Sequence, residues 1–266
     1  MQVSILGCGW LGLPLAQSLL KKGYAVKGST TSPEKLVILE EAGITPFLLS
    51  LNTNVITGDI SGFLTNSEVL IIDIPPRLRG IESELFTDKI KTLIPCIEQS
   101  EIKQVLFISS ISVYGNNDDM VTEETIAIPD SDSGKQLLEA EQLLQSNLNF
   151  KTTVLRFAGL IGSNRHPVYH LAGKENLPNP YAVINLIHQE DCIGIIERII
   201  EKEAWDQTFN AATPFHPARK EYYTTKAIEL KLPQPQFVSE KGSTGKIISS
   251  QKIVGLLEYD FIIDRL

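Results

Sequence analysis

The sequence predicts an α/β protein with a Rossmann-type, doubly wound parallel sheet and a small C-terminal substrate-side domain. Two observations predict this fold. Short, β-rich apolar runs alternate with helical patterns, which is typical of a parallel sheet covered by helices. The glycine-rich turn GCGWLG, at residues 7–12, directly follows the first of these runs and opens a helix.

Seven strands are predicted, at Val3–Leu6, Ala25–Ser29, Pro46–Leu49, Val69–Asp73, Val105–Ser109, Thr152–Phe157 and Thr208–Ala211. Most of these runs are apolar throughout, so we expect both of their faces to be buried. Helices are expected between them at Trp10–Lys22, Pro33–Ala42, Ile81–Gln99, Lys135–Gln145 and Asp191–Glu201. Residues 163–185 read as a loop, with prolines at 167, 178 and 180. We therefore assign residues 1–162, with 183–212, to the Rossmann domain, and residues 163–182 and 213–266 to the substrate-side region.

The composition excludes several classes of protein. The 266 residues carry a net charge of −8, which argues against binding to nucleic acid. No apolar run is long enough to span a membrane, and no basic leader precedes the first strand, so we expect a cytoplasmic protein. The cysteines Cys8, Cys96 and Cys192 are too widely spaced for a metal knuckle or a disulfide framework. His166 and His170 lack neighbouring ligands, so no metal site is predicted.

The turn at residues 7–12 matches the dinucleotide-binding fingerprint in its required context. Gly7 would make the tight turn, Gly9 would admit a pyrophosphate close to the main chain, and Gly12 would allow close packing of helix on strand. The amides at the start of the helix, at Trp10 and Leu11, would attract the anion. The alternative is a tight strand-to-helix turn without a ligand.

Dinucleotide-binding proteins of this type usually carry an acidic residue after the second strand, where it binds the ribose. Here Thr30, Thr31 and Ser32 follow that strand, and Lys35 lies three residues further on. Hydroxyl groups and a cation would accept a 2′-phosphate, so the segment favours NADP over NAD as cofactor. In the alternative reading, Ser32 caps the next helix, Pro33 occupies its first position and Lys35 is solvated.

Four further segments carry a resemblance to a known family. They are Asp73–Pro76, Ser109–Gly115 (SSISVYG), Leu155–Gly162 (LRFAGLIG) and Asn185–Asp191 (NLIHQED). In content and order they resemble the extended short-chain dehydrogenase/reductase superfamily, NAD-dependent epimerase/dehydratase family. The resemblance implies that Ser110 is a catalytic serine. It also implies that Ile74, Pro75, Pro76 and Ser109 lie along the cofactor.

The helix that carries the family's YxxxK pair departs from the pattern. One register puts Ser133 and Leu137 at the two positions, and the other puts Ser131 and Lys135 there. No tyrosine occurs between Tyr114 and Tyr169. We therefore expect an atypical branch without the acid/base pair, because a phenol near pKa 10 needs such a lysine to act near neutral pH. Tyr114 and Lys135 stay as weaker catalytic candidates, with packing and solvation as their alternatives.

Other polar residues have structural interpretations beside functional ones. Arg77 and Arg79 could meet an anion or lie solvated in a loop, and Arg156 is expected to anchor loops at the sheet edge. His188 is expected to be structural and Asp191 to cap the following helix. Of the adjacent tyrosines 222 and 223, at least one should be in the core.

Two functions stay open. The first is an NAD(P)-dependent oxidoreductase or epimerase acting on a small polar molecule, such as a sugar nucleotide. The second is a dinucleotide-binding sensor or regulator without catalysis. Both predict a monomer or homodimer with a small-molecule ligand and no membrane or nucleic-acid partner.

Overall fold

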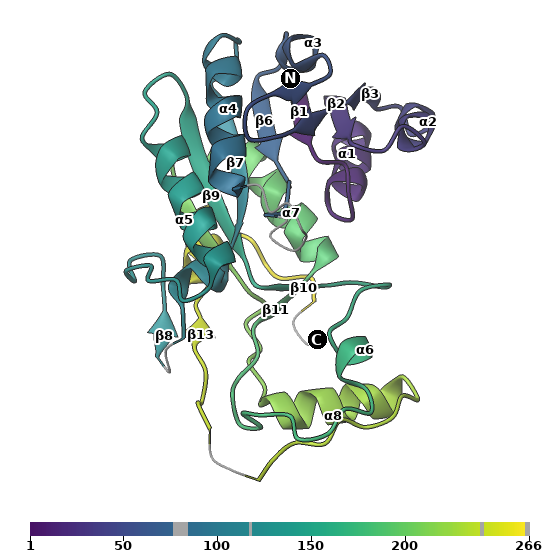
Figure 1. Cartoon of the computed structure of the whole chain (residues 1–266), viewed down its shortest axis with the longest axis vertical. Helices are drawn as coiled ribbons and strands as arrows, with labels where there is room; N and C mark the ends of the chain where they lie inside the picture. The colour runs from purple at the N-terminus through teal and green to yellow at the C-terminus, as the bar shows by residue number, and fades with distance from the viewer. Residues whose placement is uncertain (77–84, 117–118, 240–241, 264–266) are drawn as a thin grey trace.

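A computed structural model of the chain describes residues 1–76, 85–116, 119–239 and 242–263 (Figure 1). Seven strands form one parallel sheet in the order β12-β9-β7-β6-β1-β2-β3. They are β1 (Gln2–Leu6), β2 (Ala25–Thr30), β3 (Thr45–Leu48), β6 (Val69–Ile72), β7 (Gln104–Ser110), β9 (Lys151–Phe157) and β12 (Thr208–Ala211). The seven predicted strands are confirmed, with ends that differ by at most one residue.

The strand order reverses beside β1. The chain moves outward from β1 through β2 to β3, and then returns to β6 on the other side of β1. The carboxyl ends of β1 and β6 therefore border the topological switch point, where open α/β sheets form their ligand crevice. The Rossmann-type fold predicted from the sequence is confirmed.

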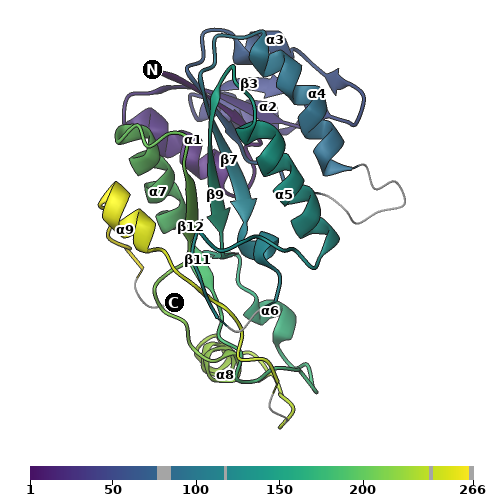
Figure 2. The same ribbon diagram turned by 90° about the vertical axis from the view of Figure 1, so that its left-hand side faces the viewer.

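Helices cover both faces of the sheet (Figure 2). One face carries α1 (Gly12–Lys21), α7 (Gln189–Glu201) and α9 (Gln251–Leu257), and the other carries α3 (Ile60–Leu64), α4 (Phe86–Glu98) and α5 (Asp132–Gln145). Helix α2 (Lys35–Glu41) packs beside β2 and β3 at the sheet edge. Helix α2 starts two residues later than expected, and the first residues of the predicted helix at 81–99 lie outside the described residues.

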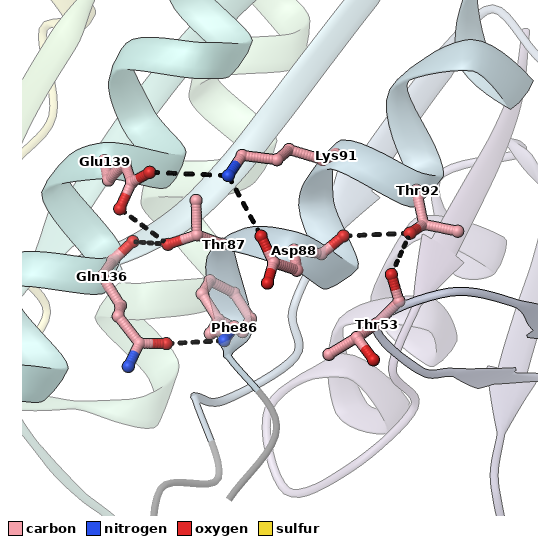
Figure 3. A network of polar contacts seen from close by, with 8 residues as sticks. All are labelled: Thr53, Phe86, Thr87, Asp88, Lys91, Thr92, Gln136 and Glu139. Atoms are coloured by element: carbon pink, nitrogen blue, oxygen red, sulfur yellow. Dashed lines mark hydrogen bonds and ion pairs between the residues drawn. The ribbon is translucent and has the colours of Figure 1, made fainter.

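Polar contacts join α4 to α5 (Figure 3). The Gln136 side-chain oxygen accepts a hydrogen bond from the Phe86 amide at 2.5 Å and so satisfies one of the unpaired amides at the start of α4. Thr87 donates to Glu139 at 3.2 Å, and Lys91 lies 3.7 Å from the same carboxylate. These contacts fix the two helices against each other on this face of the sheet.

A smaller lobe lies beyond the carboxyl ends of the strands (Figure 1). It contains the parallel pair β10 (Gly159–Ile161) and β11 (Leu186–His188), with α6 (Val168–Leu171) and α8 (Arg219–Glu229). Its own apolar cluster consists of Ile161, Val168, Ile184, Leu186, Tyr222, Tyr223 and Ala227. The short pairs β4 (Ser50–Leu51) with β5 (Ile56–Thr57), and β8 (Met120–Val121) with β13 (Ile247–Ile248), complete the described strands.

The C-terminal helix α9 packs against the sheet lobe. Ile253 and Leu257 of α9 are fully buried in the main core. The reason is an apolar face on α9 that fits against α7 and β12. Helix α9 and the residues after it, up to 263, therefore pack on the sheet lobe.

Asp191 holds this segment, and it does not cap α7 as we expected. Its carboxylate accepts hydrogen bonds from the Tyr259 hydroxyl at 2.9 Å and from the amides of Ile262 at 2.7 Å and Ile263 at 3.2 Å. The N-cap of α7 is His188, whose Nδ1 accepts from the Glu190 amide at 3.3 Å. The structural role expected for His188 is thereby confirmed.

Candidate functional site

The three glycines after β1 meet different constraints. Gly7 has φ +108°, and a Cβ there would lie 2.3 Å from the Asp73 carbonyl oxygen. A Cβ at Gly12 would lie 2.2 Å from the Gly7 carbonyl oxygen, so only glycine permits this contact between helix and strand. At Gly9 a Cβ would meet nothing within 4 Å. The fold therefore needs Gly7 and Gly12, whereas the open space at Gly9 leaves room for another molecule to approach the main chain.

A crevice of about 170 Å³ opens at the switch point beside this loop. Eight of the predicted cofactor residues line it: Gly7, Gly9, Thr30, Thr31, Ser32, Lys35, Ile74 and Pro75. Its other lining residues are Leu6, Cys8, Ser29, Leu49, Leu51 and Asp73. Trp10, Leu11, Gly12, Pro76 and Ser109 are not among the lining residues. Three strand ends that are distant in sequence thus meet at one cavity.

The carboxyl end of β2 and the two residues after it present hydroxyl groups and no carboxylate to this crevice. The Ser29 hydroxyl accepts a hydrogen bond from the Gly7 amide at 2.9 Å, and the Thr30 hydroxyl accepts from the Ser32 amide at 3.1 Å. The alternative interpretation, in which Ser32 caps α2, is wrong: Glu34 precedes the first residue of α2, and no side chain caps this helix. The helix starts late because a turn from Ser32 to Lys35 comes first, and this turn leaves Lys35 exposed at the rim.

Burial strongly shifts the pKa values of two groups at the base of the crevice. Burial raises the pKa of Asp73 to about 7, against the opposing effects of a hydrogen bond from the Gly12 amide and of the Arg165 charge. Burial also raises the pKa of the Cys8 thiol to about 12, so Cys8 is an inert packing residue. Asp73 is thus a carboxyl group that changes charge near neutral pH directly behind the glycine loop.

Arg165 brings a positive charge to the same loop, and sequence reasoning missed it. Its guanidinium carbon lies 5.0 Å from the centre of the Trp10 ring, and its side chain is exposed. Trp10 is half-buried, and its indole nitrogen donates to Asn164 at 2.9 Å. The only local signal was an arginine shortly after Gly162, and its distance of 155 residues from Trp10 hides the contact.

The catalytic candidates lie at the carboxyl end of β7 and on α5. The Ser110 hydroxyl accepts a hydrogen bond from the Ser112 amide at 3.2 Å and so starts the 3₁₀ turn η1 (Ile111–Tyr114). Lys135 is 61% exposed and lies 3.7 Å from Asp132, so the structure does not bring its ammonium to the crevice. Leu137 is buried on the inner face of the same helix. Of the candidates, Ser110 alone keeps a position at the sheet edge with partial exposure.

Tyr114 belongs to a buried polar network below this edge. Its hydroxyl accepts from Arg156 at 2.6 Å and donates to Asn210 at 2.9 Å. Arg156 also pairs with Glu141 at 2.6 Å, and the same carboxylate accepts from Ser109. Because Tyr114, Ser109 and Arg156 are hydrogen-bonded within this network, they hold β7, β9 and α5 together. Arg156 therefore anchors α5 and η1, and not the loops at the sheet edge that we expected.

Lys246 is a second cation that sequence reasoning missed. Its ammonium donates to the carbonyl oxygens of Ile111 at 3.2 Å and Gly115 at 2.5 Å, at the two ends of η1. Asn185 fixes its strand through the Lys246 carbonyl at 2.8 Å and the Ile248 amide at 2.9 Å. Burial lowers the pKa of Lys246. The C-terminal segment thus delivers a half-buried ammonium to the turn that follows Ser110.

His166 packs against Tyr222 and Tyr223 in the small lobe. His166 Nε2 lies 2.8 Å from the Tyr222 hydroxyl, and its Nδ1 accepts from the Val168 amide at 3.1 Å. Tyr222 and Tyr223 are each 6% exposed, so both are core residues. Burial lowers the pKa of His166 to about 4. This cluster stabilises the lobe rather than opening to the crevice.

Arg77 and Arg79 lie outside the described residues. Within residues 1–76, 85–116, 119–239 and 242–263, no group of three or more His, Cys, Asp or Glu side chains is arranged to hold a metal ion. In the same ranges, no helix has the length and apolar character needed to cross a membrane.

Comparison with known proteins gives both a sequence relative and structural relatives. No protein-family model matches the chain. Protein YeeZ of Escherichia coli K12 is 34% identical over 262 residues, which cover 98% of this chain and 95% of YeeZ. A protein of unknown function from Silicibacter pomeroyi superposes with a TM-score of 0.80 at 21% identity, covering 99% of this chain and 94% of that one.

Structures of NAD-dependent epimerases agree equally well. The UDP-glucuronic acid 4-epimerase of Bacillus cereus, solved with UDP-glucuronic acid and NAD, has a TM-score of 0.79 at 18% identity, covering 99% of this chain and 95% of the epimerase. A putative NAD-dependent epimerase/dehydratase from Methylobacillus flagellatus has a TM-score of 0.79 at 22% identity, covering 99% and 94%. The chain therefore belongs to the family of Protein YeeZ and has the fold of the NAD-dependent epimerases and dehydratases.

Proposed function

We propose that the chain binds a nicotinamide dinucleotide in the crevice between β1 and β6. The observation that carries the proposal is the single cavity lined by the glycine loop, the hydroxyl segment after β2, and Ile74 and Pro75 after β6. The vacant volume at Gly9 fits a diphosphate that approaches the amides at the start of α1. NAD in the B. cereus epimerase agrees with this ligand class.

NADP is the preferred form in this proposal. Thr30, Thr31 and Ser32 offer hydroxyl groups where an acidic residue would repel a 2′-phosphate. Lys35, exposed at the rim of the same crevice, adds a cation that a phosphate would attract.

The reaction we propose is oxidoreductase or epimerase chemistry on a small polar substrate, of which a sugar nucleotide is the leading class. The bound nicotinamide would supply hydride transfer. Ser110 would hold a substrate oxygen by a hydrogen bond, and Lys246 would keep the η1 turn in position and supply positive charge beside it. In this proposal, Ser110 and Lys246 together would replace the tyrosine and lysine of the YxxxK pair on α5.

A second candidate function is a dinucleotide sensor without catalysis. The observation that favours it is on α5, where Leu137 is buried and Lys135 is paired with Asp132 at the surface. A serine without a neighbouring base is a poor proton shuttle. Such a protein would bind the dinucleotide and transfer no hydride.

Titration of the purified protein with NADPH and NADH, followed by fluorescence, tests the ligand. We expect saturable binding, tighter for NADPH, and its loss in Gly9→Asp, because the new side chain would occupy the space of the diphosphate. Gly255→Asp is the matched control, since a Cβ at Gly255 on α9 also meets nothing within 4 Å. Absence of binding in the unaltered protein would contradict the proposal.

Hydride transfer separates the two functions. The reduced nicotinamide is followed by absorbance with UDP-glucose, UDP-glucuronic acid and a panel of carbonyl compounds. Turnover that is lost in Ser110→Ala supports the enzyme. Tight binding without turnover across the panel supports the sensor.

A further inference from the structure

A short hairpin of the small lobe covers the glycine loop. Gly162 and Arg165 exchange two main-chain hydrogen bonds, at 2.9 and 3.1 Å. The hairpin directly follows β10, so it starts from the carboxyl side of the sheet. The geometry holds residues 162–165 in a fixed turn rather than an open loop.

This hairpin is fitted closely to Trp10. The Asn164 side-chain oxygen accepts from the indole nitrogen at 2.9 Å. A Cβ at Gly162 would come within 2.8 Å of Trp10 Cζ2, so the absence of a side chain permits the contact. Gln189, at the start of α7, donates to the Trp10 carbonyl oxygen at 2.5 Å. Groups more than 150 residues away in the sequence thus hold Trp10 by its ring and by its main chain.

Arg165 is the charged residue of this hairpin, and it also contacts Trp10. Its guanidinium lies over the Trp10 ring, 5.0 Å from the ring centre, a distance typical of a cation–π contact. Among the described residues, no carboxylate lies within ion-pair distance of it. Its charge nevertheless reaches Asp73 and Cys192, where burial raises the pKa of each group and the Arg165 charge opposes this effect.

We propose that Arg165 binds the diphosphate of the dinucleotide from above, opposite the amides at the start of α1. This inference rests on the proposed function. The planar guanidinium presents parallel N–H groups that match two phosphate oxygens, and its stacking on Trp10 fixes the plane in advance. The diphosphate would then be held between the sheet lobe and the small lobe, so that the cofactor joins the two.

The fluorescence of Trp10 can be used to measure binding at the glycine loop. The chain has two tryptophans, Trp10 and Trp205, and Trp205 follows α7 beside Met1, at the opposite edge of the sheet. In a Trp205→Phe parent, the emission of Trp10 therefore reports binding at the loop. We expect Arg165→Gln in this parent to weaken NADPH and NADH equally, by about tenfold, because one charge-assisted contact is lost. The affinities of Arg165→Lys should lie between those of the parent and of Arg165→Gln, since lysine keeps the charge and loses the planar group.

Arg219→Gln is the matched control. Arg219 also stacks on an aromatic ring, 5.6 Å from the centre of Phe237, but it belongs to α8. Its replacement should leave both affinities unchanged. Adenosine, which has no phosphate, should bind the parent and Arg165→Gln equally, whereas ADP should follow the dinucleotides.

The outcomes separate this inference from the proposed function. If the parent binds neither dinucleotide, both fail. If the parent binds them and Arg165→Gln binds equally well, the Arg165 proposal alone is overturned. It is also overturned if adenosine weakens as much as NADPH, if only NADPH weakens, or if UDP-glucuronic acid weakens while the dinucleotides do not.

Discussion

The guanidinium of Arg156 and the carboxylate of Glu141 form a buried ion pair with a nitrogen to oxygen distance of 2.6 Å. The two side chains are 8% and 1% exposed. The contact is bidentate, since the Nε of Arg156 donates to the same carboxylate. It fixes the rotation of α5 against β9, and thereby decides which α5 residues face the sheet edge.

Replacement of Glu141 by glutamine should destabilise the protein by about 3–5 kcal/mol, because Arg156 would be left buried with an unpaired charge. Urea unfolding followed by circular dichroism measures the change. Glu139→Gln, on the same helix with a 54% exposed carboxylate near Lys91, should cost less than about 1 kcal/mol. Equal losses in the two variants would show that the buried pair has no special role.

Thr30→Asp should shift cofactor preference towards NAD. A carboxylate at the end of β2 would repel the 2′-phosphate and accept hydrogen bonds from a ribose hydroxyl, so the affinity ratio of NADPH to NADH should fall by about tenfold. Lys35→Gln should weaken NADPH and leave NADH unchanged. An unaltered ratio in both variants would contradict the proposed phosphate pocket.

Dinucleotide affinity should fall as pH rises through about 7. Asp73 is neutral below this pKa and negative above it, and its charge lies behind the loop that would hold the diphosphate. NADH is the suitable ligand, because it has no 2′-phosphate that titrates. We expect about fivefold weaker binding at pH 8 than at pH 6, and a flat profile in Asp73→Asn.

The same carboxyl group links folding to pH. Its pKa is raised from 3.8, so the native state holds the proton more tightly, and the free energy of unfolding should decrease as pH rises from about 4 to 7. Asp73→Asn should lack this decrease. A pH dependence of binding or unfolding shared equally by the variant would assign it to another group.

His166 should make the small lobe sensitive to acid. Its pKa falls from 6.5 to about 4 on folding, so the unfolded chain binds a proton that the native state excludes. Stability from this source is present above pH 6.5 and is lost as pH falls towards 4. Thermal unfolding of His166→Gln should depend less on pH in this window than that of the unaltered protein. His170→Gln, an exposed neighbour, should behave like the unaltered protein.

If the protein is an enzyme, Lys246→Met should lower turnover by about tenfold or more while the affinity for NADPH stays within twofold, because the ammonium contacts η1 and not the glycine loop. Lys246→Arg, which keeps the charge, should recover part of the rate. Equal loss of binding and turnover would indicate that Lys246 serves only to hold the fold.

The fold could be predicted because its signals are local. The run Val3–Leu6, the glycines that follow it and the helix beyond them are adjacent in the sequence, and each obeys a steric rule that depends on near neighbours. The segment after β2 shows the limit of such reasoning. Its serine and proline resemble a helix start. In the structure a turn from Ser32 to Lys35 forms there instead, and it leaves this part of the chain in the crevice.

Two charged residues of the site, Arg165 and Lys246, could not be predicted in this way. Arg165 meets Trp10, and Lys246 meets the carbonyls of η1, only after the small lobe has folded over the sheet edge. Neither residue stands in a pattern that specifies its partner, because a lone basic residue in a loop is usually solvated. Tertiary contact, not local sequence, gives them their positions.

The hydrogen bonds to Asp191 imply an order of events during synthesis. This buried carboxylate lies at the start of α7, but its three donors come from residues 259–263. When α7 has just left the ribosome, the residues that donate hydrogen bonds to Asp191 have not yet been translated. Burial of the Asp191 carboxylate would then be unfavourable, because the carboxylate would lack these partners. The helix therefore gains these contacts only after about sixty further residues have been translated.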